Sequence, residues 1–159
     1  MSSANRPQRL DSLLITSSSL ESSLPAKWLF KSDPEHYSFG DLERDGKAVW
    51  DGISNNLALQ NLRKIRRGDL VFIYHSGSER AVVGTAEVAS DPYPDPRLKD
   101  PKLVVVDLAA KEKLVRAVGL DEIKKQNGLE NCDLVRLPRL SVMPVSEEQW
   151  RMIMELARQ

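Results

Sequence analysis

The sequence predicts a single α+β domain in which short helices flank a small mixed β-barrel of about five to six strands. Two observations support this class. Short runs of β-branched and aromatic residues recur along the chain, and the helical patterns between them show no regular strand–helix alternation. A length of 159 residues is typical of one domain, and it suffices to bury a core without disulfides or metals.

The first 25 residues differ from the rest of the chain. Residues 1–25 are rich in serine and contain no tryptophan, phenylalanine or tyrosine. Such a segment has too little apolar surface to offset its ordering entropy, so we expect a disordered tail. Its content of arginine and serine weakly suggests a transit peptide, but the acidic residues Asp11 and Glu21 argue against one. The globular pattern begins at Ala26 and predicts a domain over residues 26–159.

The expected strands are short and separated by glycine or proline. They cover residues 28–30, 70–74, 81–88, 103–108 (continuing to 115 or 118) and 139–145. Within the third strand, Gly84 predicts a bulge or bend. Four prolines between residues 91 and 101 predict a loop.

Helices are expected where capping signals precede apolar residues at helical spacing. They cover residues 38–46, 54–67, 120–126 and a C-terminal helix that begins after Ser146. The last is the clearest, because Ser146 and Gln149 have the spacing of a capping box and Val145 can pack against Trp150.

The composition excludes several classes of function. Lys and Arg number 23 and Asp and Glu number 23, a balance that argues against non-specific coating of nucleic acid. No apolar run approaches the ~18 residues of a membrane span, so no membrane partner is expected. One cysteine and two histidines cannot form a disulfide or a Cys/His zinc site, and we expect neither metal nor cofactor.

No residue pattern indicates catalysis. Cys132 has acidic neighbours that disfavour its thiolate, which predicts a small buried side chain rather than a nucleophile. His75 and Ser76 are adjacent on a predicted strand end and would point to opposite faces. The glycines form no phosphate-binding loop. We therefore expect a protein that is not an enzyme.

Two patterns favour nucleic-acid binding, and each has a simpler structural reading. Arg63, Lys64, Arg66 and Arg67 place four positive charges within five positions, which equally fits a solvated helix face. Polar residues also follow aromatic ones at three places, where aromatic faces can stack on a base while polar groups contact its edge. Aromatic residues in a domain of this size equally fit a core role.

The same segments resemble the EVE domain family over residues 26–159. The matching stretches are Trp28-Leu29-Phe30-Lys31-Ser32-Asp33-Pro34 with Tyr37-Ser38, Trp50-Asp51-Gly52-Ile53 with Asn55, Ala58 and Leu62-Arg63, Gly68-Asp69 through Tyr74-His75-Ser76, and Arg139-Leu140-Ser141-Val142-Met143-Pro144-Val145. Ala81–Gly84 and Pro92–Asp95 also stand where the family would place them.

The resemblance implies a PUA-like barrel that recognises a modified nucleobase, such as a methylated or hydroxymethylated cytosine, in DNA or RNA without catalysis. The residues implied around the pocket are Lys31, Ser32, Trp50, Asp51, Asn55, Tyr74, His75 and Ser76. Nucleic-acid backbone contacts are expected from Arg63, Lys64, Arg66, Arg67 and Arg139. Trp28 and Phe30 are expected in the core. The expected partner is a nucleic acid carrying a modified base, bound by a monomer in the cytoplasm, or in the nucleus of a eukaryote.

Departures from the family pattern motivate an alternative. Ser54 and Asn56 stand where the family usually has arginine and tyrosine, Leu59 where arginine is common, and Asp33 replaces glutamate. Losing an aromatic near the pocket removes stacking worth ~1–3 kcal/mol per base. The alternative is a small-molecule or protein-interaction module that has kept the fold and lost base recognition; an enzyme acting on a nucleotide is a third, weaker hypothesis.

Overall fold

The computed structural model describes residues 24–159, so the tail expected over residues 1–25 lies almost wholly outside the described residues. Seven strands and five helices make up this part of the chain. The strands are β2 (Lys27–Ser32), β3 (Lys47–Trp50), β4 (Leu70–His75), β5 (Ala81–Val88), β6 (Tyr93–Pro94), β7 (Val104–Gly119) and β8 (Val142–Val145). The helices are α2 (Phe39–Asp45), α3 (Asn56–Lys64), α4 (Leu120–Lys125), α5 (Asp133–Arg136) and α6 (Glu147–Ala157).

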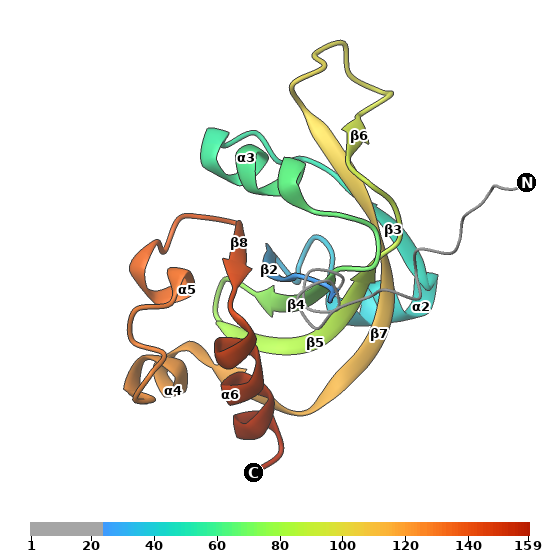
Figure 1. Ribbon diagram of the computed structural model, residues 1–159. Coiled ribbons are helices and arrows are strands. Elements are labelled where there is room, and N and C mark those ends of the chain that lie inside the picture. Colours follow the sequence, from blue (N-terminus) through green and yellow to red (C-terminus); the bar gives the residue numbers. More distant parts are fainter. Residues whose placement is uncertain (1–23) are drawn as a thin grey trace, which may run out of the picture.

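All seven strands belong to one mixed, strongly curved sheet (Figure 1). Its order is β3-β7-β5-β4-β2-β8, with β6 pairing to the start of β7. The strands β2 and β4 run parallel, and every other pairing is antiparallel. The α+β class is confirmed, but two details of the prediction were wrong: the sheet has seven strands, and β3 and β8 do not pair to close a barrel.

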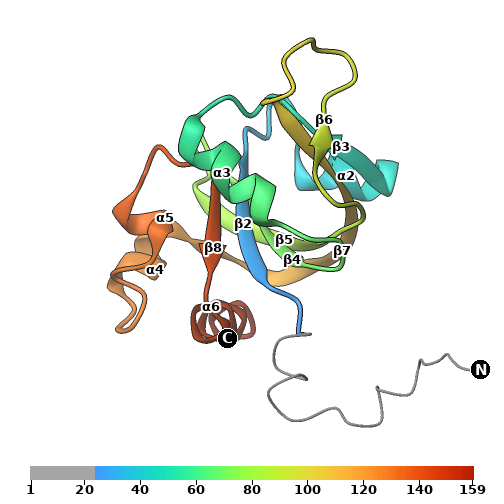
Figure 2. The ribbon, with the colours of Figure 1, turned by 45° about the horizontal axis from the view of Figure 1, so that its top comes forward.

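Helix α3 covers the open side of the sheet, because it packs against both β7 and β8 (Figure 2). Its buried Asn61 donates from Nδ2 to the carbonyl oxygen of Val142 on β8, 2.8 Å away. In a closed barrel, the two edge strands of the sheet would pair with each other. Here the amide of Asn61 and the apolar face of α3 take the place of that pairing.

The expected core residues are buried. Trp28 and Phe30 lie in the core, and the indole Nε1 of Trp28 donates to Asp69 at 2.9 Å. On the outer face of the sheet, Trp150 of α6 stacks on Phe72 with ring centroids 3.7 Å apart. The capping box of α6 is confirmed, since Ser146 Oγ accepts from Gln149 N and Gln149 Oε1 accepts from Ser146 N.

Gly84 lies at a shift in the β5–β7 register, as its place in the strand predicted. A Cβ at this position would stand 2.4 Å from the ring of Phe39, the first residue of α2. The capping box of Ser38 and Asp41 starts that helix and Gly46 ends it, with a φ of 78° that favours glycine. The glycine therefore lets α2 lie directly on the sheet.

Other elements differ from the prediction for local reasons. Helix α3 ends at Lys64 rather than at residue 67, because Asp69 Oδ2 accepts the backbone N–H of Arg66 and turns the chain. The strands β3 and β6 and the single-turn helix α5 were not predicted. Each is four residues or shorter, which is too short for a periodic pattern to show.

Candidate functional site

A cavity of about 580 Å³ opens where β2 ends beside β3; we call it the β2–β3 pocket. Lys31 and Ser32 contribute from the end of β2, and Trp50 and Asp51 from the end of β3. The other lining residues come from the turn after β2, from β3 and the loop that follows it, and from the start of β8: Asp33, His36, Tyr37, Ala48, Val49, Gly52, Ile53 and Ser141.

Trp50 and Tyr37 form the aromatic side of the pocket. Their rings meet edge to face, with centroids 6.1 Å apart and planes at 77°, and the buried Phe30 lies 5.9 Å from Trp50. The Tyr37 hydroxyl donates to Asp45 Oδ2 at 2.8 Å. Burial and this hydrogen bond raise the pKa of Tyr37 to about 12. The ring is therefore a fixed, neutral wall at physiological pH.

Lys31 and Ser32 are held by the protein itself. The Lys31 ammonium donates to the carbonyl oxygen of Pro138 at 2.6 Å and lies 5.6 Å from the centre of the Tyr74 ring. Burial lowers the pKa of Lys31. The Ser32 hydroxyl donates to the carbonyl oxygen of Tyr37, which fixes the turn that carries this aromatic residue.

Asp51 is oriented by Arg97, a residue 46 positions further along the chain. Arg97 first forms a forked pair with the buried Asp95, with Nε 3.3 Å from Oδ1 and Nη2 3.2 Å from Oδ2. Its Nη2 then donates to Asp51 Oδ2. Hydrogen bonds from Arg97 lower the pKa of Asp95. Asp51 Oδ1 accepts no hydrogen bond from residues 24–159, which leaves one fixed acceptor at the pocket.

Of the eight predicted pocket residues, the pocket thus brings together Lys31, Ser32, Trp50 and Asp51. Asn55, Tyr74, His75 and Ser76 do not line it. Asn55 caps α3 by accepting from Ala58 N at 3.0 Å, and Tyr74 is a core residue.

His75 and Ser76 do not line the pocket but hold the segments that do. The buried His75 accepts from the backbone N–H of Phe39 through Nε2 at 2.9 Å. The proton of its neutral ring is therefore on Nδ1, which lies 2.8 Å from Glu79 Oε1. The backbone N–H of Ser76 donates to the carbonyl oxygen of Ser32 at 2.9 Å. These contacts position α2 and the end of β2.

The sequence reasoning missed Arg97 and, as a pocket residue, Tyr37. Tyr37 stands in the Tyr37-Ser38 pair of the stretch that resembles the EVE family, and that resemblance was its only signal. Arg97 lies in the proline-rich loop, and no local pattern there points to Asp51.

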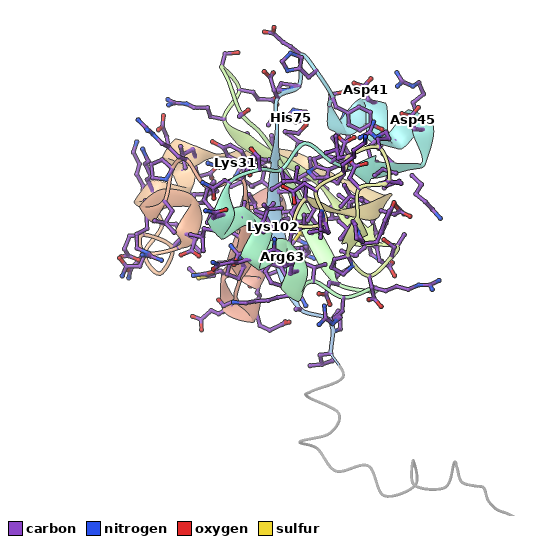
Figure 3. The ribbon with its side chains drawn as sticks, turned by 90° about the horizontal axis from the view of Figure 1, so that it is seen from above. Lys31, Asp41, Asp45, Arg63, His75 and Lys102 are labelled. Atoms are coloured by element: carbon purple, nitrogen blue, oxygen red, sulfur yellow. The ribbon has the colours of Figure 1, made fainter. Side chains whose placement is uncertain are left out.

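The predicted backbone-binding residues lie in two places. Lys64, Arg66 and Arg67 line a cavity of about 420 Å³ at the start of β2. Six residues of strand, ~20 Å, separate that edge from the pocket. Arg63 donates to the carbonyl oxygen of Lys102 at 2.8 Å, and Figure 3 shows this pair well away from His75. Arg139, by contrast, is exposed beside Leu140 and Ser141, close to the pocket.

Neither a metal site nor a membrane-spanning helix is indicated within the described residues. Residues 24–159 contain no cluster of three His, Cys, Asp or Glu side chains that could hold a metal ion. None of the described helices is both long enough and apolar enough to cross a membrane. Cys132 is buried, as expected, and burial raises the pKa of its thiol.

The fold of the described residues also occurs in a distantly similar solved structure. ASCH from Zymomonas mobilis, 12% identical with a TM-score of 0.52, shares this fold over 82% of the chain and 95% of its own length. The EVE domain model matches residues 26–156, and the chain belongs to the EVE domain family. This confirms the resemblance seen in the sequence.

Relatives within the family are similar over most of the chain. Thymocyte nuclear protein 1 of Mus musculus is 31% identical, covering 81% of this chain and 72% of the relative. Rpa0253 from Rhodopseudomonas palustris is 35% identical with a TM-score of 0.80, covering 84% of this chain and 93% of that structure. Human THYN1 in complex with 5-methylcytosine-containing DNA is 27% identical with a TM-score of 0.77, covering 84% and 98%.

Proposed function

We propose that this protein binds a modified nucleobase, such as a methylated or hydroxymethylated cytosine, in the β2–β3 pocket, and that it does so by binding alone, without catalysis. One observation carries the proposal: a fixed aromatic wall and a fixed carboxylate oxygen face the same cavity. Its volume of about 580 Å³ is in the range of small-ligand sites. The complex of human THYN1 with 5-methylcytosine DNA supports the same ligand class for this chain.

Each pocket group has a role in this proposal. The aromatic side of the pocket packs against the flipped base and its methyl group. Asp51 Oδ1 accepts from the exocyclic amine of cytosine, the acid–cytosine pairing known from direct readout. Lys31 and Ser32 line the pocket at the end of β2. A single enclosed base needs few cations, which fits a chain with equal numbers of acidic and basic residues.

The direct test compares oligonucleotides that carry 5-methylcytosine or cytosine at one position, titrated at two salt concentrations. We expect tighter binding of the modified oligonucleotide at both. Equal affinity for the two, or no binding at low salt, would contradict the proposal.

A blocked pocket provides the structural control. Val49 lines the pocket with 49% of its surface exposed, and Val115 is 87% exposed on β7 outside it. Val49→Trp should abolish the preference for the modified base because the indole fills the cavity. Val115→Trp adds the same side chain elsewhere and should bind normally. If both variants bind alike, the pocket is misplaced.

The alternative, a small-molecule or protein-interaction module, is favoured by the departures beside the pocket. Ser54 and Asn56 are exposed, and Leu59 is buried in the core, so these three positions offer neither an aromatic face nor a cation. Thermal stabilisation by a nucleoside-sized ligand, with none from oligonucleotides, would support this module instead.

A further inference from the structure

A second concavity lies between the start of α3 and the segment before β8; we call it the α3–β8 groove. It has a volume of about 310 Å³. Asn55 and Leu57 line one side, and Arg136, Pro138, Arg139 and Leu140 line the other. Figure 2 shows the start of α3 beside the loop that joins α5 to β8.

The groove adjoins the β2–β3 pocket, because residues 138–141 run from one to the other. Lys31 lines the pocket, and its ammonium bonds the carbonyl oxygen of Pro138, which lines the groove. Leu140 lines the groove and the next residue, Ser141, lines the pocket. The backbone N–H of Lys31 donates to Ser141 O at 3.0 Å. The lining of the groove thus begins one residue along the chain from the lining of the pocket.

The groove offers a cation that is not already engaged. Arg139 is exposed and forms no ion pair or side-chain hydrogen bond within residues 24–159. Arg63 and Arg66 differ, because their guanidinium groups donate to the carbonyl oxygens of Lys102 and Arg63. They also lie at the other end of α3, ~13 Å away along nine residues.

Four of the other lining residues are apolar: Leu57, Leu137, Pro138 and Leu140. Leu57 is 42% exposed although it is a large aliphatic residue, and Pro138 is exposed opposite it. An unengaged guanidinium beside exposed apolar side chains matches the chemistry of a nucleotide, whose phosphate is anionic and whose sugar and base have apolar faces.

We infer that the α3–β8 groove is a second nucleotide subsite, which binds the nucleotide next to the base held in the pocket. Arg139 binds the phosphate that links the two nucleotides, and Leu57 and Pro138 contact the neighbouring sugar or base. This inference rests on the proposed function, since the pocket fixes where the strand enters. The position of the groove beside the pocket favours a nucleic-acid strand over an acidic peptide as the occupant.

The test combines one protein variant with one change in the ligand. The ligand is a short single-stranded DNA with central 5-methylcytosine, made either with normal phosphates or with uncharged methylphosphonates flanking the modified nucleotide. Wild type should lose about tenfold in affinity when these phosphates are neutralised, as expected for one charge-assisted contact. Arg139→Gln should bind the normal strand about tenfold more weakly and respond little to neutralisation. Its salt slope should fall by ~0.7.

Arg158→Gln is the matched control, because Arg158 is exposed at the C-terminal end of α6 and lines neither the pocket nor the groove. It should behave like wild type. If Arg139→Gln responds to neutralisation as strongly as wild type, the second subsite is wrong. The second subsite is also wrong if Leu57→Ser leaves the affinity for the normal strand unchanged.

The proposed function is tested separately by the ratio of the affinities for strands that carry 5-methylcytosine and for strands that carry cytosine. That ratio should persist in Arg139→Gln, because the variant leaves the pocket intact. A ratio of one in wild type overturns the base-reading function, whatever Arg139 does. An acidic peptide that requires Arg139, with no effect of Arg139→Gln on DNA, would assign the groove to a protein partner and overturn the inference.

Discussion

Asp51→Asn tests which chemical group of the base the pocket recognises. The substitution keeps the shape of the side chain but replaces a pure acceptor by an amide that also donates. In the folded protein, Asp51 Oδ2 is held by Arg97 and Oδ1 is left to accept from the base. Thymine and 5-methylcytosine share the methyl group and differ at C4, where cytosine has an amine and thymine a carbonyl oxygen.

The expected magnitude follows from the exposure of the carboxylate. Hydrogen bonds to charged groups contribute ~1.5–3 kcal/mol. The Asp51 side chain is 40% exposed, so solvent screening places the contact near the lower limit, about tenfold in affinity. Wild type should therefore prefer 5-methylcytosine to thymine about tenfold. Asp51→Asn should reduce this preference to one or below, because its free amide group no longer accepts from the cytosine amine and can donate to the thymine carbonyl.

Fluorescence anisotropy with labelled strands that carry 5-methylcytosine or thymine measures both affinities. Arg97→Gln provides the second side of a double-mutant cycle. Since Arg97 acts through Asp51, it should lower the preference in the wild-type background and add nothing in Asp51→Asn. A tenfold preference retained in Asp51→Asn would refute this account of recognition, and additive effects of the two substitutions would refute the positioning role of Arg97.

Two further predictions concern Tyr37, which lines the pocket, and Gly84, which packs against α2. The pKa of Tyr37 is raised to about 12, so its contribution to stability is complete below pH 10 and is lost as pH rises toward 12. The stability difference between wild type and Tyr37→Phe should shrink over that interval in urea unfolding, and a constant difference would contradict the hydrogen bond to Asp45. Gly84→Ala should destabilise the fold by ~1–3 kcal/mol, because its Cβ would lie 2.4 Å from the Phe39 ring. Partial recovery of the melting temperature in Gly84→Ala/Phe39→Leu would show that this clash is the cause, whereas an unchanged melting temperature in Gly84→Ala would disprove the close packing.

The elements that were predicted correctly depend on neighbours in the chain. The capping boxes of Ser38 and Ser146 involve residues three positions apart, and both form as expected. The apolar runs of β4 and β5 likewise predict buried strands from neighbouring residues alone. The elements that were missed, β3, β6 and α5, have four residues or fewer, and Trp50 at the end of β3 is central to the site.

The candidate site shows the same division. Aromatic and polar residues at strand ends drew attention to Lys31, Ser32, Trp50 and Asp51, which the pocket unites. Asn55, Tyr74, His75 and Ser76 have the same sequence signature, but one caps a helix, one is core and two hold the pocket from behind. Whether a side chain points into the pocket, into the core or toward a neighbouring segment decides between these roles. The sequence motif alone does not specify that direction.

By itself the sequence determined the α+β class, the caps, the core aromatics and the family. Those properties follow from composition, spacing and ordered motifs along the chain. Only the tertiary structure decided that the sheet stays open under α3, that Arg97 meets Asp51, and that the Arg63–Arg67 segment lies at the far edge while Arg139 lies near the pocket. Each of these depends on pairing between segments distant in the chain, where register and packing rather than local preference set the outcome.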